Sequence, residues 1–197
     1  LARRMLFPSL YYLHMEGFLA PGQRIIGSSR SPHTDEAFRE KMRGWVQDRV
    51  GDYFDEETFA TFAERVSYVS VDAKDHNDFL TLREALHDGK DEAVFYLSTS
   101  PDIFSSLTAN LKKAGLTDAP NRIVVEKPIG HDLKSCMEIN NALAEAFSED
   151  RTFRIDHYLG KETVQNLIAL RFGNTIFEPL WSAVSIDSVQ LTISETV

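Results

Sequence analysis

The sequence predicts an α/β fold with a doubly wound parallel sheet, followed by the beginning of an α+β domain. Short apolar runs rich in β-branched residues alternate with longer amphipathic stretches, which is typical of parallel strands covered by helices. Prolines follow three of these runs, at Pro32, Pro101 and Pro128, where the chain must turn at the carboxyl edge of the sheet.

Strands and helices are expected in alternating order along the chain. The expected strands are Arg24–Gly27, Val66–Val71, Ala93–Leu97, Arg122–Val125 and Thr152–Ile155. The expected helices are Leu1–Leu19, Ala37–Val50, Phe79–Leu86, Ile103–Lys113 and Leu133–Phe147. In the last of these helices the apolar residues fall on one face, which is the pattern of a helix packed on a core.

The pattern at both ends of the chain predicts incomplete domains. No strand precedes the opening helix, so the Rossmann-like sheet is expected to lack its first strand and the glycine-rich turn after it. Near the other end, Ile186–Ser194 alternates as a strand should, but a lone strand cannot pair its backbone groups. We therefore expect a truncated domain at residues 1–155 and the start of a second domain at residues 156–197. The absence of a start Met and of a signal-like segment indicates a cut N-terminus.

The composition excludes several classes of protein. The 197 residues carry 21 Lys and Arg against 30 Asp and Glu, and a net charge of −9 disfavours a general binder of nucleic acid or of anionic membranes. A single cysteine, Cys136, allows neither an intramolecular disulfide nor a cysteine-built metal site. No apolar run approaches the roughly 20 residues that span a bilayer. We expect a soluble, cytoplasmic protein.

The densest group of chemically active side chains is Arg154-Ile155-Asp156-His157-Tyr158-Leu159-Gly160-Lys161-Glu162. It follows the last expected strand, at the end of a sheet where open α/β folds bind ligands. His157, Tyr158 and Lys161 can supply a cation and hydrogen-bond donors to an anion such as phosphate. Asp156 can orient a histidine base. The alternative is a solvated loop in which Asp156 caps the next helix.

A second motif, Val125-Glu126-Lys127-Pro128, ends another expected strand. Because proline restrains the backbone, Lys127 can project into the same crevice, with Glu126 as its restraint. We expect the Lys127–Pro128 bond to be cis. The alternative is an ordinary exposed lysine in a turn.

Arg30 is the third candidate. After the second strand of a dinucleotide-binding unit, an acidic residue favours the ribose hydroxyls of NAD, whereas an arginine accommodates the 2′-phosphate of NADP. Arg30 is the only charged residue between Ile25 and His33, which favours NADP. The alternative is a solvated loop residue.

Taken together, these residues resemble the glucose-6-phosphate dehydrogenase family. The run at 154–162 matches the active-site signature of the family without a gap. Residues 126–128 with Gly130 match its second motif, which other sugar oxidoreductases share. Residues 1–4 look like the end of its glycine-rich fingerprint. Arg171-Phe172-Gly173-Asn174 and Ser194-Glu195 also fit, so the resemblance covers essentially the whole chain.

The resemblance implies NADP-dependent oxidation of glucose 6-phosphate to 6-phosphogluconolactone, in the pentose phosphate pathway and without a metal. It implies an NADP-binding domain at 1–155, the start of a glucose-6-phosphate-binding domain at 156–197, and a homodimer or homotetramer at full length. It implies cofactor contacts at Arg30, Val71, Asp72 and Lys127, substrate contacts at Lys127, His157, Tyr158, Lys161 and Glu195, and a partner of the catalytic histidine at Asp156.

Three positions depart from the family pattern. The base of the family is a histidine well beyond the signature, and no histidine follows His157 here, so the 197 residues alone are expected to be inactive. Met5 stands where the family has a lysine near the substrate, and Phe104 replaces a tyrosine that touches the cofactor in some members. These departures leave two alternatives: another NAD(P)-dependent sugar oxidoreductase, or a non-catalytic nucleotide-binding or assembly module.

Overall fold

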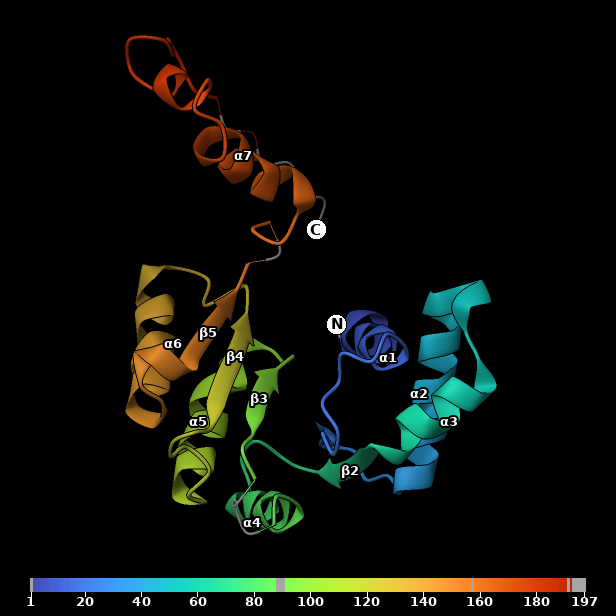
Figure 1. Cartoon of the computed structure of the whole chain (residues 1–197). Helices are drawn as coiled ribbons and strands as arrows, with labels where there is room; N and C mark the ends of the chain where they lie inside the picture. Colours follow the sequence, from blue (N-terminus) through green and yellow to red (C-terminus); the bar gives the residue numbers. More distant parts are fainter. Residues whose placement is uncertain (1, 88–90, 157, 191, 193–197) are drawn as a thin grey trace. The chain divides into compact units, whose positions relative to one another are not determined.

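The chain folds into two compact units, Leu1–Arg154 and Ile155–Val197, which we call unit 1 and unit 2. The computed structural model describes residues 2–87, 91–156, 158–190 and 192 (Figure 1). No helix among these residues is long and apolar enough to cross a membrane.

Strands and helices alternate along the described part of the chain. The strands are β1 (Ile25–Ser29), β2 (Val66–Ser70), β3 (Val94–Leu97), β4 (Arg122–Glu126) and β5 (Thr152–Ile155). The α-helices are α1 (Phe7–Met15), α2 (Asp35–Val50), α3 (Glu56–Glu64), α4 (His76–Ala85), α5 (Phe104–Lys113), α6 (Leu133–Ala146) and α7 (Glu162–Phe172). A π-helical stretch, Ala2–Leu6, leads into α1, and 3₁₀ turns occupy Gly51–Tyr53, Pro101–Ile103, Glu149–Arg151 and Glu178–Leu180.

Every expected strand of the doubly wound sheet is present, but the helices at the start of the chain differ from prediction. The opening helix ends at Met15 rather than Leu19, because Gly17 adopts a left-handed conformation, with φ at 75°, that closes the helix. The sequence reading missed α3, which Asp55 caps by accepting a hydrogen bond from the Thr58 amide at 2.7 Å.

The strand expected at 186–194 is not seen. Its described residues, 186–190 and 192, form no strand; 191, 193 and 194 lie outside the described residues. A strand needs a neighbour to pair its N–H and C=O groups, and the described residues from 156 to 192 contain no other strand.

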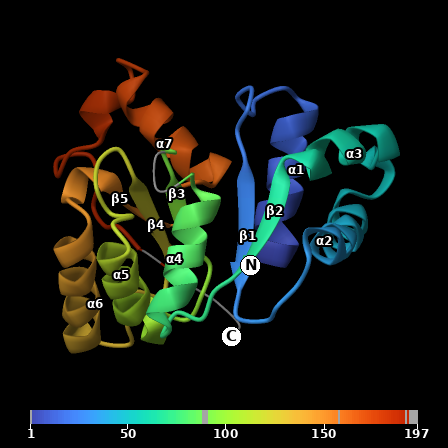
Figure 2. The ribbon, with the colours of Figure 1, turned by 90° about the horizontal axis from the view of Figure 1, so that it is seen from below.

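The strands form two sheets instead of one. β1 runs parallel to β2, with Gly27 opposite Tyr68. β3 runs parallel to β4, with Tyr96 opposite Val124, and β5 lies beside β4 (Figure 2). The doubly wound strand order places the first strand between the second and the fourth, which here are β1 and β3. The two sheets are therefore separated at the position that the expected first strand would take.

Two hydrophobic cores hold unit 1, and each packs helices on one of the sheets. The first contains the fully buried Tyr11, Met42, Val46, Phe62 and Val66. The second contains Phe79, Phe104, Leu116, Ile123 and Leu143. Burying a large apolar side chain contributes about 1.5–3 kcal/mol. Ile26 of the first sheet also packs against the second core, and this contact joins the two halves.

The helix α2 shows why the first core forms where it does. Its N-cap, Thr34, accepts a hydrogen bond from the Ala37 amide at 3.2 Å, and acidic residues fill the first turn. Phe38, Met42 and Val46 recur every four residues and are buried on the side that faces the sheet.

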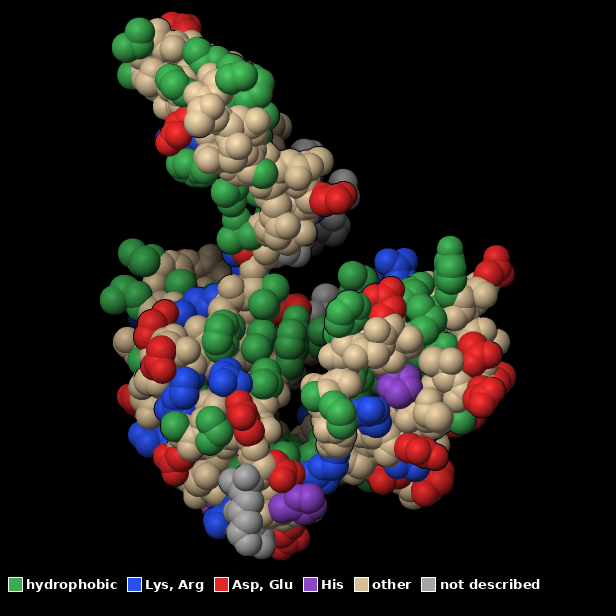
Figure 3. All heavy atoms as spheres, viewed as in Figure 1, with side chains coloured by type: hydrophobic (Ala, Val, Ile, Leu, Met, Phe, Trp, Pro, Cys, Tyr) green, Lys and Arg blue, Asp and Glu red, His purple; other side chains and the backbone are tan. Residues whose placement is uncertain are grey.

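Unit 2 consists of α7 and the residues around it. Large apolar side chains cover much of its surface (Figure 3). They include Leu167, Ile168, Phe172, Ile176 and Leu180. None of the residues of α7 is buried, in contrast to the core residues of unit 1.

Candidate functional site

The turn that carries Arg30 follows β1 directly. Tyr68 of β2 holds the turn, because its hydroxyl donates to the Ser29 carbonyl at 3.0 Å and also bonds the Ser31 carbonyl. The Ser70 hydroxyl donates to the Arg30 carbonyl at 3.2 Å. The backbone of Arg30 is thus fixed by the neighbouring strand, while its guanidinium side chain is exposed.

Val71 and Asp72 follow β2 and lie beside that turn. The Val71 amide donates to the Ser29 carbonyl at 2.9 Å, which extends the pairing of β1 and β2. The Asp72 amide donates to Oδ2 of Asp78 at 2.7 Å, and Asp72 Oδ1 accepts from the Lys74 amide at 3.0 Å. Three of the predicted cofactor contacts, Arg30, Val71 and Asp72, are therefore gathered at the carboxyl ends of β1 and β2.

A hollow of about 270 Å³ opens at the carboxyl ends of β3 and β4. Its lining is formed by Leu97, Ser98, Thr99, Glu126, Lys127 and Pro128. Lys127 is exposed and lies just beyond β4. The Lys127–Pro128 peptide bond is cis, as expected from the sequence. The second motif thus lines a hollow at the edge of the sheet where open α/β folds bind ligands.

Two polar side chains that the sequence reading did not select belong to this region. Tyr96 of β3 donates a hydrogen bond from its hydroxyl to Oε1 of Glu126. Burial, and then the bond to Glu126, raises the pKa of Tyr96 above its usual 10, so its hydroxyl stays protonated into more alkaline solution than a free phenol does. The Ser98 hydroxyl oxygen is buried and has no hydrogen-bond partner among the residues that the structure describes. No sequence signal identifies either side chain, because the Tyr96–Glu126 bond depends on the register of β3 against β4 and Ser98 lies just beyond β3.

Residues 155–162 of the signature lie at the start of unit 2 and are held by local contacts. Asp156 Oδ1 accepts a hydrogen bond from the Tyr158 amide at 3.0 Å. The Lys161 amide donates to the Tyr158 carbonyl at 3.2 Å, and the Lys161 ammonium lies 4.1 Å from the centroid of the Tyr158 ring. Asp156, Tyr158 and Lys161 are therefore brought together locally.

The structure corrects the alternative in which Asp156 caps the next helix. α7 begins at Glu162, and its N-cap is Lys161, whose side chain makes no capping bond. Asp156 lies too far before the helix to cap it and closes a local turn instead. His157 and Glu195, two predicted substrate contacts, lie outside the described residues.

The two departures inside unit 1 differ in their surroundings. Phe104 is 1% exposed and belongs to the second core, where a tyrosine hydroxyl would need a buried partner. Met5 is 47% exposed and lies in the π-helical stretch before α1.

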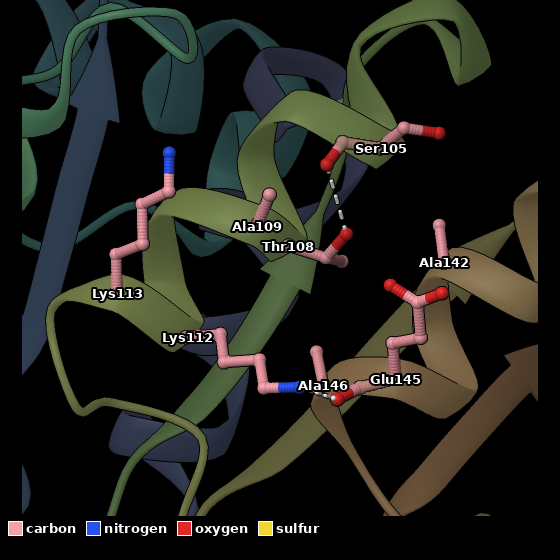
Figure 4. Close-up of a pocket in the computed structure, with 8 residues that line it drawn as sticks. All are labelled: Ser105, Thr108, Ala109, Lys112, Lys113, Ala142, Glu145 and Ala146. Atoms are coloured by element: carbon pink, nitrogen blue, oxygen red, sulfur yellow. Dashed lines mark hydrogen bonds between the residues drawn. The ribbon is translucent and has the colours of Figure 1, made fainter.

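A second hollow, of about 280 Å³, lies between α5 and α6 (Figure 4). Lys112 crosses it to donate to the Glu145 carbonyl at 2.7 Å, and the Thr108 hydroxyl donates to the Ser105 carbonyl at 3.2 Å. Its lining includes the small side chains of Ala109, Ala142 and Ala146. It contains none of the cofactor-binding, substrate-binding or catalytic residues that the sequence predicts.

Comparison with known proteins extends these observations. Residues 1–166 match the family described as "Glucose-6-phosphate dehydrogenase, NAD binding domain". The glucose-6-phosphate 1-dehydrogenase of Rhizobium meliloti is 45% identical over 199 residues, covering 100% of this chain and 40% of the relative. That of Zymomonas mobilis is 43% identical over 198 residues, covering 100% of this chain and 41% of the relative.

Solved structures of the same kind are similar in fold. A glucose-6-phosphate 1-dehydrogenase from Mycobacterium avium superposes with a TM-score of 0.82 at 34% identity, covering 93% of this chain and 40% of that one. A glucose-6-phosphate dehydrogenase in complex with glucose 6-phosphate gives a TM-score of 0.81 at 38% identity, covering 91% and 39%. The chain thus spans about 40% of the length of the curated relatives named here.

Proposed function

Because this chain belongs to the glucose-6-phosphate dehydrogenase family, we propose that it forms part of an NADP-dependent enzyme that oxidises glucose 6-phosphate to 6-phosphogluconolactone. The observation that carries this proposal is the uninterrupted signature at 154–162, whose Asp156, Tyr158 and Lys161 are held together directly after β5. Residues 1–155 would form the coenzyme domain, and residues 156–197 would begin the substrate domain.

The cofactor class is a nicotinamide dinucleotide, as in the matching family. The residues at the strand ends fit such a group. The exposed Arg30 offers a cation on a fixed turn, and Ser98 offers a buried hydroxyl that lacks a partner among the described residues. Leaving a buried hydroxyl unpaired costs about 1–3 kcal/mol, which a polar atom of a ligand would recover. The choice of NADP over NAD follows from the Arg30 cation, which suits a 2′-phosphate.

The sugar phosphate would be bound by Lys127, His157, Tyr158, Lys161 and Glu195. A relative with this fold has been solved with glucose 6-phosphate bound, which supports this substrate class for the chain. The ring of Tyr158 restrains the Lys161 ammonium through a cation–π contact, so less side-chain freedom is lost when Lys161 binds an anion.

The chemistry requires a proton acceptor for the C1 hydroxyl and a hydride acceptor for C1. A bound nicotinamide dinucleotide supplies the hydride acceptor. Asp156 would orient the histidine that takes the proton and stabilise its charged form. That histidine is not among residues 158–197. Lys127, at the hollow beside β4, would contact both cofactor and sugar and hold them in one geometry. The full-length enzyme would work in the cytoplasm as a homodimer or homotetramer.

NADPH formation in a protein of full family length that contains this chain tests the proposal. We expect absorbance at the NADPH band to rise with glucose 6-phosphate and NADP, and to stay flat with glucose or fructose 6-phosphate. The 197 residues alone should give no turnover, because no histidine base follows His157. Turnover with another sugar phosphate in preference to glucose 6-phosphate would overturn the substrate, and tighter binding of NAD than of NADP would overturn the cofactor.

A further inference from the structure

The hydrogen bond between Tyr96 and Glu126 joins two neighbouring strands at the edge of the hollow that Lys127 lines. In the β3–β4 register Tyr96 lies opposite Val124. Because side chains alternate along a strand, Glu126 projects from the same face as Val124 and Tyr96. The phenol therefore reaches diagonally across the sheet to the last residue of β4.

Lys127 is the residue that directly follows Glu126, the hydrogen-bond partner of Tyr96. Glu126 is the last residue of β4, whereas Lys127 and Pro128 lie beyond the strand and are exposed. The ladder of backbone hydrogen bonds therefore ends just before the lysine. A hydrogen bond from a phenol to a carboxylate is charge-assisted and stronger than a neutral one. The bond from Tyr96 therefore fixes the side chain of Glu126, the last residue of the strand, and Lys127 follows Glu126 directly.

The same bond affects the electrostatics of the hollow. Burial and the Glu126 carboxylate raise the pKa of Tyr96, so the phenol keeps its proton, and donates its hydrogen bond to Glu126, into the alkaline range. One carboxylate oxygen of Glu126 is thereby engaged by Tyr96.

We propose that Tyr96 is a positioning residue for Lys127, acting through the carboxylate of Glu126. The inference rests on the proposed function in that it takes Lys127 as the residue that contacts cofactor and sugar. In this role Tyr96 would set the direction in which the lysine enters the hollow, without contacting the reacting atoms or the cofactor itself.

The test measures the dissociation constant of NADPH by fluorescence, together with kcat and KM for glucose 6-phosphate, in a protein of full family length. Tyr96→Phe removes only the hydroxyl. We expect the dissociation constant of NADPH to rise about 3- to 10-fold and kcat/KM to fall about 10-fold. Glu126→Ala removes the acceptor and should give a similar loss. The double variant should lose no more than about twofold beyond either single variant.

Tyr11→Phe is the matched structural control. Tyr11 is fully buried in the first core, and its hydroxyl accepts a hydrogen bond from the Asp55 amide at 3.0 Å. We expect Tyr11→Phe to lower the melting temperature while the NADPH dissociation constant and kcat/KM stay within twofold of wild type. A Tyr96→Phe protein that behaves in the same way would overturn the proposal, because its hydroxyl would then be purely structural.

A variant that lacks Lys127 distinguishes an effect of Tyr96 that acts through Lys127 from a direct effect of Tyr96 on NADPH binding. In Lys127→Ala, Tyr96→Phe should cause no further weakening of NADPH binding beyond about twofold. A full additional loss in that background would show that Tyr96 acts without Lys127 and would overturn the inference. If wild type fails to oxidise glucose 6-phosphate yet the binding results hold, the proposed function fails while the positioning role stands.

Discussion

A methyl group placed on Gly27 of β1 would lie 2.4 Å from Cζ of Phe38 in α2. The Phe38 ring packs against the strand where Gly27 has no side chain, and it also lies 4.7 Å from the ring of Tyr68, the residue opposite Gly27. Tyr68 in turn holds the turn that carries Arg30. The glycine therefore lets α2 pack closely beneath the proposed cofactor-binding turn.

We expect Gly27→Ala to lower the free energy of unfolding by about 1–3 kcal/mol, because Phe38 must move to admit the methyl group. Urea denaturation measures this change. Gly44→Ala is the control: Gly44 lies in α2 with nothing within 4 Å of an added Cβ, so we expect an increase of about 0.5–1 kcal/mol. Equal effects of the two substitutions would contradict the packing argument.

Arg30→Ala should raise the dissociation constant of NADP about 10- to 100-fold and change that of NAD less than threefold, because a charge-assisted contact to the 2′-phosphate is lost. Isothermal titration with each dinucleotide measures both constants. Arg49→Ala, at the exposed far end of α2, is the control and should change neither. Equal losses for NAD and NADP would show that Arg30 does not bind the 2′-phosphate.

Lys161→Ala should raise KM for glucose 6-phosphate by at least about 10-fold. The variant lacks the ammonium that lies beside the Tyr158 ring and that we propose binds the phosphate. The dissociation constant of NADPH should stay within twofold, which separates a substrate contact from a cofactor contact. Lys113→Ala, at the hollow between α5 and α6, is the control for loss of one surface charge. An unchanged KM in Lys161→Ala would remove this residue from the phosphate site.

The start of α6 should make stability depend on pH. Asp132 Oδ1 accepts from the Ser135 amide at 2.7 Å, and the Ser135 hydroxyl accepts from the Asp132 amide at 3.0 Å. The hydrogen bonds from Ser135 hold the pKa of Asp132 below its usual 3.8. Since folding lowers this pKa, the stabilisation is complete above pH 3.8 and is lost as pH falls through the lower, folded value.

Thermal melts between pH 2 and pH 6 measure this effect. The melting temperature of the wild type should fall more steeply below pH 4 than that of Asp132→Asn, because asparagine can still cap the helix but does not titrate. Asp118→Asn provides a control at an exposed aspartate outside any helix cap. Parallel pH curves for wild type and Asp132→Asn would contradict the prediction.

The strands and most helices of unit 1 could be predicted from the sequence because their signals are local. β-Branched runs and the prolines after them mark where strands end, and the apolar spacing of α2 and α6 marks the faces that they bury. The signature at 154–162 was found because its residues are adjacent in the chain, and its local turn brings three of them together.

What could not be predicted depends on pairing between distant residues. The Tyr96–Glu126 bond spans 30 positions and exists only because β3 and β4 pair in one register, which the sequence does not specify. The lack of a partner for the Ser98 hydroxyl becomes visible only when the surrounding residues are placed. The segment 186–194 shows the converse: its described residues, 186–190 and 192, form no strand despite their alternation, and no other strand lies among the described residues from 156 to 192.

The gap between the two sheets has a consequence for handling these 197 residues by themselves. Among the described residues β1 pairs only with β2, and the outer side of β3 has no strand beside it. Such rows of backbone donors and acceptors recruit strands from other molecules, as in domain swapping and fibril growth. We therefore expect the isolated polypeptide to aggregate in a concentration-dependent way, and to aggregate more slowly when a parallel strand, supplied in cis or as a peptide, fills the space between β1 and β3.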